Sequence, residues 1–242
     1  MTTEPEPPTV HEARRAEIAA EVPGWYSPAV HLAIPTAIGV GVAIAAAFAL
    51  RHVTWADALA LPVTLFAGFG LEWRAHKFVL HHRTPGLGIL YERHELKHHV
   101  IYTYDDMAMR SPRELYLILM PAYAIVLVFL LVVPFALATA WLASTNAALF
   151  VVIASMLFFL SYEWMHMSYH LPEGSLIGRS RVVARLRELH RRHHDPRLMK
   201  HWNFNVTVPV FDAIHRTRWS PEREAERRAR QRARRVAEEH AT

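Results

Sequence analysis

Histidine is the residue type whose spacing in this chain most clearly indicates chemistry. Of the 17 histidines, 13 fall into three windows of the sequence. These are His76, His81, His82, His94, His98 and His99; His166 and His170; and His190, His193, His194, His201 and His215. Spacings of three or four residues place two imidazoles on one face of an α-helix. Neutral imidazole is the commonest metal ligand in proteins, and it binds iron, zinc, copper and nickel. The spacing therefore predicts a metal site without specifying the metal.

The number of clustered histidines distinguishes a metal centre from simpler explanations. One histidine of this kind is more often a satisfied core residue, a surface residue or a ligand of an isolated structural zinc. Four doublets or triplets in one chain favour a metal centre instead. Nine or ten imidazoles exceed the four to six ligands of a single ion, so we expect two metal ions.

Long apolar runs indicate an integral membrane protein. Residues 30–50 contain no Asp, Glu, Lys or Arg, and residues 115–162 are a further 48 residues without one. A bilayer core of ~30 Å needs about 20 helical residues, so the second run is long enough for two spans. Ser144, Thr145 and Asn146 mark the expected turn between them. A weaker run at 58–71 predicts another span if its helix continues past the interface.

These features predict an all-α fold, an integral membrane four-helix bundle with a cytoplasmic histidine-rich helical cap. The expected spans are about 30–50, 57–75, 115–135 and 147–166, within a membrane domain of residues 29–220. Residues 1–28 are expected to form a polar tail that ends in an interfacial anchor at Trp25 and Tyr26. Residues 221–242 are expected to form a charged extension, either a solvated helix or a disordered segment.

The distribution of basic residues predicts the orientation in the membrane. Residues 74–113 hold seven Lys or Arg and residues 166–242 hold 17, whereas only Arg51 separates the first two spans. Because short cytoplasmic loops carry excess Lys and Arg, we expect both termini and the metal site to be cytoplasmic. The opening residues have no positive segment leading into an apolar one, so no cleaved signal peptide is expected.

Composition also bears on partners. The formal charge of +5 and the pI near 9.7 do not predict nucleic-acid binding, because the arginines lie beside spans, where anionic headgroups attract them. The chain has no cysteine, which excludes disulfides, thiolate zinc sites and cysteine-ligated iron–sulfur clusters. Any electrons are therefore expected to come from outside or from a cofactor that the chain does not bind through sulfur. Because the polar residues ahead of the first span are too few for a haem domain, we expect a separate protein to deliver them.

The histidine groups occur in an ordered pattern that resembles a known family. The pattern is His76-x4-His81, His94-x3-His98-His99, His166-x3-His170 and His190-x2-His193-His194, followed by Asn205-Val206-Thr207 and Phe211-Asp212. In this order, between four predicted spans, the stretch from about Leu71 to Thr217 resembles the fatty acid hydroxylase and sterol desaturase superfamily of integral-membrane di-metal oxygenases.

The resemblance implies a site and a reaction. By position, the expected metal ligands are His76, His81, His98, His99, His166, His170, His190, His193 and His194, and His94 joins them as the favoured ligand of the second group. In that family the histidines bind two metal ions, usually described as iron, although zinc is found in some members. The implied reaction is O2-dependent hydroxylation or desaturation of a fatty acyl, sterol-like or other lipid. A separate ferredoxin, cytochrome or reductase would supply the electrons.

The second histidine group departs from the family pattern. That pattern is usually His-x2-His-His, which would require histidine at position 95, where this chain has Glu95. We favour His94 as the ligand; the alternatives are that Glu95 supplies a carboxylate or that the second metal is bound differently. His82, His201 and His215 are lower-ranked candidate ligands, expected to lie beside the ligands or at the surface.

Several carboxylates are candidates for orienting the ligands. Glu163 lies three residues before His166 on the same helical face, and a buried carboxylate needs a partner. We therefore expect a hydrogen bond from a ligand imidazole, the alternative being an interfacial glutamate paired with an arginine. Ligand N–H groups often donate to carboxylates. The further candidates for this role are Asp105, Asp106, Asp195 and Asp212.

Other functions remain open from the sequence. A carotenoid hydroxylase is the nearest alternative, because its histidine pattern is related. A histidine-rich metal transporter or sensor belongs to a different class, but transport needs ionisable groups along the path through the bilayer, and the span interiors carry none. A third alternative is a zinc enzyme that cleaves or isomerises a lipid by Lewis-acid chemistry.

Overall fold

The computed structural model describes residues 9–121 and 123–240, and these residues confirm the predicted all-α class. The described part of the chain is built from helices connected by loops and contains no strand. Three of its helices are long and apolar enough to cross a membrane: α2 (Pro28–Ala49), α8 (Ala124–Leu142) and α9 (Thr145–Tyr169). Ser144 caps α9 by accepting a hydrogen bond from the Ala147 amide, so the expected turn between two of these helices is present.

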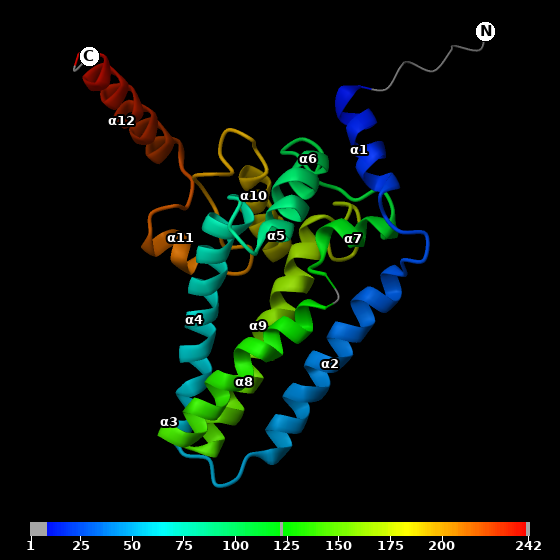
Figure 1. Ribbon diagram of the computed structural model, residues 1–242, viewed down its shortest axis with the longest axis vertical. Helices are drawn as coiled ribbons and strands as arrows, with labels where there is room; N and C mark the ends of the chain where they lie inside the picture. Colours follow the sequence, from blue (N-terminus) through cyan, green and yellow to red (C-terminus); the bar gives the residue numbers. More distant parts are fainter. Residues whose placement is uncertain (1–8, 122, 241–242) are drawn as a thin grey trace.

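The central helix of the molecule is α9. It packs against α2 and α8, and also against α4 (Ala60–Ala75), as Figure 1 shows. With 16 residues, α4 is about 24 Å long, which is shorter than a ~30 Å bilayer core. Three helices therefore meet the length and composition of a span, where the sequence predicted four. A short helix, α3 (Trp55–Ala58), precedes α4 at the end of the bundle far from the histidines.

The third apolar helix begins later than expected. We predicted a span over 115–135, but α8 begins at Ala124, after η3 (Pro112–Glu114) and the separate short helix α7 (Leu115–Ile118). Residues 119–121 are not helical, and Pro121 has no N–H to donate. The apolar residues 115–119 pack into a protein core and do not belong to the long apolar helix α8. Apolarity alone does not distinguish that environment from lipid.

Apart from α3, the short helices gather at one end of the long ones, which we call the histidine end (Figure 1). One continuous helical segment there consists of α5 (Gly88–Arg93), the π-helix η2 (His94–His98) and α6 (His99–Ile101). A second π-helix, η1 (His76–Leu80), extends α4. Helices α10 (Arg181–His193) and α11 (Val210–Ile214) also lie at this end.

The N-terminal region is more ordered than the polar tail that we expected. Residues Val10–Ala20 form α1, which packs against α6. The buried Arg15 side chain donates to the carbonyls of Ile101 and Ala108 and to the carboxylate of Glu114. Tyr26, predicted as an interfacial anchor, is also buried, and its hydroxyl lies 2.7 Å from His31 Nδ1. Residues 1–8 of the expected tail lie outside the described residues.

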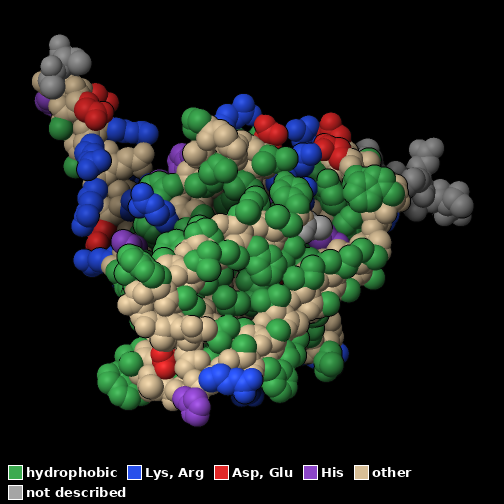
Figure 2. Space-filling view, turned by 60° about the horizontal axis from the view of Figure 1, so that its bottom comes forward, with side chains coloured by type: hydrophobic (Ala, Val, Ile, Leu, Met, Phe, Trp, Pro, Cys, Tyr) green, Lys and Arg blue, Asp and Glu red, His purple; other side chains and the backbone are tan. Residues whose placement is uncertain are grey.

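The surface separates apolar from charged regions. In Figure 2 hydrophobic side chains cover the middle of the molecule, and most charged side chains lie on the histidine end and on the protruding α12 (Pro221–Glu239). Such an apolar surface on a folded chain is typical of contact with lipid. The charged extension is thus a helix over these residues; residues 241–242 lie outside the described part.

Candidate metal centre

The structure brings the histidines of separate sequence motifs into two buried groups. The first cluster consists of His76, His81, His94, His99 and His193, and the second of His98, His166, His170 and His190. Within each cluster, one nitrogen of every imidazole lies within 4.8 Å of the corresponding nitrogens of the others. The two clusters could each bind a metal ion.

The tenth predicted ligand, His194, lies between the clusters. Its ring stacks on that of His99 with 4.1 Å between centroids and is 4.8 Å from that of His98. Its Nε2 lies 3.0 Å from His190 Nε2, so it extends the second cluster. All ten predicted ligands are therefore buried and gathered at one place, although they come from four segments of the chain.

Nitrogen-to-nitrogen distances in the first cluster match those around a metal ion. His76 Nε2 lies 2.9 Å from His94 Nε2, His81 Nε2 lies 2.9 Å from His193 Nε2, and His99 Nε2 lies 3.1 Å from His94 Nε2. Two nitrogens at ~2.0–2.1 Å from one ion and at right angles to each other are about 2.9 Å apart. The cluster therefore has the dimensions of a coordination shell.

The outer nitrogens of the same rings determine where the protons lie. Nδ1 of His76 donates to the Phe204 carbonyl at 2.5 Å, and Nδ1 of His193 donates to the Trp202 carbonyl at 2.9 Å. Nδ1 of His81 is hydrogen-bonded to the carboxylate of Glu95. A neutral imidazole with its proton on Nδ1 has a lone pair on Nε2. The facing Nε2 atoms of His81 and His193 are thus two acceptors, and a cation between them would satisfy both.

The second cluster presents unpaired nitrogens in the same way. Nδ1 of His98 donates to the Leu117 carbonyl at 3.1 Å, and Nδ1 of His170 donates to the Met107 carbonyl at 2.9 Å. The Nε2 atoms of His98, His166 and His170 are buried without a hydrogen-bond partner among the described residues. An unsatisfied buried polar atom costs about 1–3 kcal/mol. Three such atoms pointing to one place indicate a site built for a bound ion.

Two π-helical turns set the register of the ligands. His76 and His81 are five residues apart, a spacing that an α-helix would rotate by ~140°. The π-helix η1 has i→i+5 hydrogen bonding, which brings such residues to the same face. The second π-helix, η2, begins at His94 and places it with His99 in the first cluster.

The π-helix η2 distinguishes His94 from Glu95 as the candidate ligand. Nε2 of His94 belongs to the first cluster, as we favoured from the sequence. Glu95 instead accepts the hydrogen bond from His81 Nδ1, and its other oxygen lies 3.2 Å from Lys200 Nζ. Glu95 therefore orients a candidate ligand, and the extra residue relative to the family pattern is accommodated by the π-turn.

Burial holds the imidazoles in the form that binds metal. Desolvation lowers the pKa of His76, His94, His99 and His193 well below 6.5, and neighbouring histidines lower it further. The same causes act on His98 and His190 in the second cluster and on His194 between the clusters. Only the neutral ring has a free lone pair, so these residues are ready to bind cations at neutral pH.

Sequence reasoning missed a carboxylate that organises one side of the site. Glu72 accepts hydrogen bonds from the amides of Val206 and Thr207, at 2.5 and 2.9 Å, and from the Thr207 hydroxyl at 2.6 Å. Asn205 Nδ2 donates to it as well, at 3.1 Å. Glu72 thus holds the segment that follows the Phe204 carbonyl, the acceptor for His76. The available signal was a charged residue within an apolar helix, four positions before His76.

Asp212 supports the same segment from the other side. Its carboxylate accepts from the amides of Phe204 and Asn205 at 3.0 and 2.8 Å, and from the Thr217 hydroxyl at 2.7 Å. We predicted that Asp212 could orient a ligand N–H group directly. In the structure Asp212 does not contact a ligand imidazole. It holds the backbone of Phe204, whose carbonyl accepts the hydrogen bond from His76.

Other predicted site residues lie elsewhere. The prediction that Glu163 bonds a ligand imidazole is wrong: its carboxylate accepts from the Met120 amide, at 3.2 and 3.3 Å. That amide belongs to the non-helical segment before α8 and needs an acceptor there. Asp106 pairs with Arg15 and Asp195 with Arg197, while Asp105 is exposed.

The three lower-ranked histidines lie outside both clusters. His82, His201 and His215 are exposed. His82 follows His81 at the end of the π-turn, and its Nδ1 lies 3.0 Å from the Lys77 carbonyl. His215 stacks on Trp73 with 4.1 Å between ring centroids. Their exposure agrees with the lower rank that they received from the sequence.

No protein-family model, curated protein or solved structure matched this chain when it was compared with each. The functional interpretation therefore depends on the geometry of the two clusters, and on the order of the histidine groups in the sequence.

Proposed function

We propose that the protein is a membrane-bound di-metal oxygenase that hydroxylates or desaturates a lipid. The observation that carries the proposal is the pair of adjacent imidazole clusters, connected through the stacked rings of His99 and His194. Ten neutral nitrogen donors provide for two ions. The helices α2, α8 and α9 are long and apolar enough to cross a membrane, and α9 carries His166 of the second cluster at its end. We infer that the substrate is a lipid chain held among these helices.

The reaction requires a redox metal and an external source of electrons. A pair of iron ions held by these imidazoles would activate O2 for attack on an unactivated C–H bond. Hydroxylation consumes R–H, O2, two electrons and two protons, and yields R–OH and water. Desaturation of CH2–CH2 consumes the same reagents and yields a double bond and two waters. Because the chain lacks cysteine, we infer that a separate ferredoxin, cytochrome or reductase donates the electrons.

The residues of this chain contribute positioning and exclusion of water. The carbonyls of Trp202, Phe204 and Leu117 and the carboxylate of Glu95 fix the orientation of their imidazoles through Nδ1. Such outer hydrogen bonds increase the basicity of a ligand and limit its rotation. The burial of the clusters excludes bulk water, which would otherwise consume a reactive oxidant.

We place the clusters and both termini on the cytoplasmic side. The support is the excess of Lys and Arg in the segments around the histidine end, together with the positive-inside rule. Cytoplasmic placement makes the site accessible to soluble electron carriers. A protease-protection measurement on sealed vesicles, with a tag at the C-terminus, tests this orientation.

Metal analysis followed by lipid profiling tests the function. Protein purified without oxygen should contain two metal ions per chain, mainly iron, and membranes from cells with the gene should contain a hydroxylated or desaturated lipid that depends on O2. A hydroxylated carotenoid as the product would identify the protein as a carotenoid hydroxylase. Lipid turnover without O2 by a zinc-loaded protein would instead support Lewis-acid catalysis, and metal flux in proteoliposomes without lipid oxidation would support a transporter.

A further inference from the structure

The positive charge of the chain is concentrated in its C-terminal third. Residues 166–242 contain 17 of the 27 Lys and Arg but only nine of the 22 Asp and Glu. The remaining residues have more acidic than basic side chains, so the formal charge of +5 arises from this region. In Figure 2 basic side chains run along α12 and continue onto the adjoining part of the histidine end.

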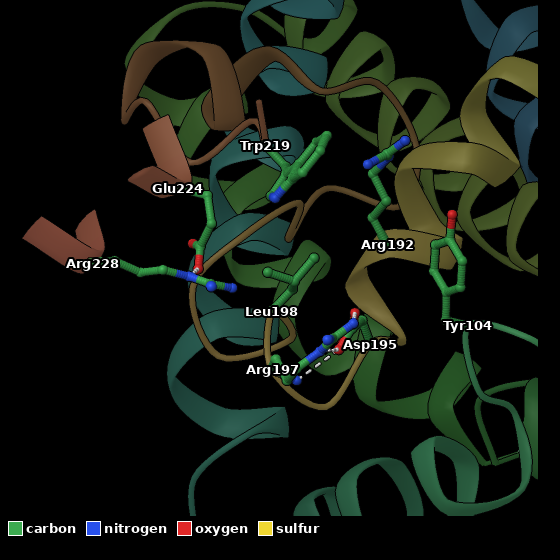
Figure 3. A pocket seen from close by; sticks show the side chains of 8 residues that line it. All are labelled: Tyr104, Arg192, Asp195, Arg197, Leu198, Trp219, Glu224 and Arg228. Carbon is green, nitrogen blue, oxygen red and sulfur yellow. Dashed lines mark hydrogen bonds and ion pairs between the residues drawn. The ribbon is translucent and has the colours of Figure 1, made fainter. Parts of the chain in front are cut away.

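A surface pocket marks the centre of this basic region. It has a volume of about 290 Å3 and lies where α10, the turn after it and the start of α12 meet (Figure 3). Its lining residues are Tyr104, Arg192, Asp195, Arg197, Leu198, Trp219, Glu224 and Arg228. The guanidinium of Arg192 lies over the Trp219 ring at 3.9 Å, so the pocket combines arginine with aromatic surface.

The carboxylates of the pocket are already paired with arginines. Asp195 pairs with Arg197 at 2.6 Å, and Glu224 pairs with Arg228 at 2.6 Å. The side chains of Arg197 and Arg228 nevertheless remain 79% and 55% exposed. An incoming acidic group therefore meets guanidinium groups, while the acidic groups behind them are held in place.

Helix α12 extends this surface outward. Arg228, Arg232 and Arg235 are spaced at i, i+4 and i+7, which places them on one face of the helix. We define the basic surface as Arg192, Arg197, Arg228, Arg232 and Arg235. Arg230 and Arg234 lie on a different face of the same helix, about 140° away on average.

A short series of hydrogen bonds connects the basic surface to the first cluster. Arg228 Nε donates to Glu224 at 2.6 Å, and Trp202 Nε1 donates to the same carboxylate at 2.8 Å. The Trp202 carbonyl in turn accepts from Nδ1 of His193 at 2.9 Å. The pocket also lies directly after His193 and His194 in the chain, through Asp195. This surface is thus the outer side of the candidate metal centre.

We propose that the basic surface binds an acidic one-electron carrier protein, which delivers the electrons for lipid oxidation. The proposal rests on the oxygenase function proposed above. Each turnover requires two electrons, so a carrier that gives up one electron per encounter must bind and be oxidised twice. Complementary charge accelerates such repeated, transient encounters, and the contacts through Glu224 and Trp202 place the bound carrier next to a candidate ligand.

The structure favours a protein over a membrane as the partner. A helix that lies on a bilayer needs an apolar face to bury among the lipids. The only large hydrophobic side chain exposed on α12 is Val236. In Figure 1 α12 also leaves the histidine end in the direction away from the long apolar helices.

A binding experiment on the full-length, metal-loaded protein in nanodiscs tests the surface. The probe is an acidic plant-type [2Fe–2S] ferredoxin, and the affinity is measured at several salt concentrations. The double variant Arg232→Gln/Arg235→Gln should weaken binding about tenfold and reduce its salt dependence. The matched control Arg230→Gln/Arg234→Gln removes the same charge from another face and should change the affinity by less than about twofold. Metal content, expected to be unchanged in both variants, reports on folding.

The outcomes separate this proposal from the oxygenase proposal. Equal effects of the two variants, or no saturable binding of ferredoxin, would overturn the docking surface. So would a short duplex RNA that binds more tightly and displaces ferredoxin. A single turnover, in which dithionite-reduced protein is mixed with O2, bypasses the carrier. If lipid is oxidised in the single turnover but the arginine variants do not weaken ferredoxin binding, only the docking site is rejected. If the unaltered protein oxidises no lipid in the single turnover, the oxygenase function is rejected.

Discussion

His94 Nε2 lies 2.9 Å from His76 Nε2, although the two residues are on different helical segments, 18 positions apart in the sequence. The π-helical turn that begins at His94 shifts the register by the one residue needed. Single π-turns of this kind occur frequently at functional sites. The local geometry of the helix thus brings His94 and His99, five residues apart, to the same cluster.

Replacing His94 should remove one metal ion. We expect His94→Ala to lower the metal content from two ions to about one per chain, because the first cluster loses the nitrogen closest to both His76 and His99. The measurement is metal analysis by mass spectrometry of purified protein. His82→Ala, which alters an exposed histidine outside the clusters, is the control and should retain both ions. Full occupancy in His94→Ala would reject its assignment as a ligand.

The two clusters should lose metal independently. His193→Ala removes a nitrogen of the first cluster, and His98→Ala removes one of the second. We expect each variant to retain about one ion per chain and the helix content of the unaltered protein, measured by circular dichroism. Loss of both ions in either variant would mean that the clusters form a single cooperative site.

The carboxylate of Glu95 should increase metal affinity through His81. Glu95→Ala removes the hydrogen-bond acceptor of Nδ1, and such changes typically cost about 10–100-fold in metal affinity. Glu95→Gln retains a neutral acceptor and should cost less. Competition with a chelator measures the affinity. Glu92→Ala, on the same helical segment but paired only with the exposed Arg83, should behave as the unaltered protein, and an equal loss there would argue against a specific role for Glu95.

Glu72 should contribute to stability as well as to ligand orientation. Glu72→Ala leaves buried donors of Asn205, Val206 and Thr207 without their acceptor. Since each unsatisfied group costs about 1–3 kcal/mol, we expect a loss of roughly 3–5 kcal/mol in the free energy of unfolding. Thr207→Val removes one of these hydrogen bonds and should cost about 1 kcal/mol. Denaturant unfolding in detergent compares the two, and similar losses would contradict the central role of Glu72.

Acid should destabilise the protein after its metal is removed. The pKa of His76, His94 and His193 is lowered below 6.5 by burial, so the unfolded chain binds more protons than the folded chain once the pH falls below about 6.5. The free energy of unfolding then decreases with falling pH. We expect a lower unfolding midpoint at about pH 5.5 than at about pH 7.5. An unchanged midpoint, measured by tryptophan fluorescence, would show that these imidazoles are not buried as described.

The sequence by itself determined the helical class, the long apolar segments and the ten candidate histidine ligands. The class and the apolar segments follow from local rules, whereas the inclusion of His76 and His81, five residues apart, came from the resemblance. Apolar residues in a run of sufficient length predict a helix in lipid, and histidines separated by three or four residues predict a shared helical face. Such rules need no knowledge of distant residues, which is why they could be applied before the fold was known.

The tertiary structure alone decided how the histidines are divided. Adjacent His98 and His99 belong to different clusters, because neighbouring side chains on a helix diverge. His190 and His193 share a helical face but also belong to different clusters, because each meets histidines from different distant segments. The same holds for Glu72, whose partners lie more than 130 residues away in the sequence. Contacts of this kind depend on how helices pack, and packing is a property of the whole chain.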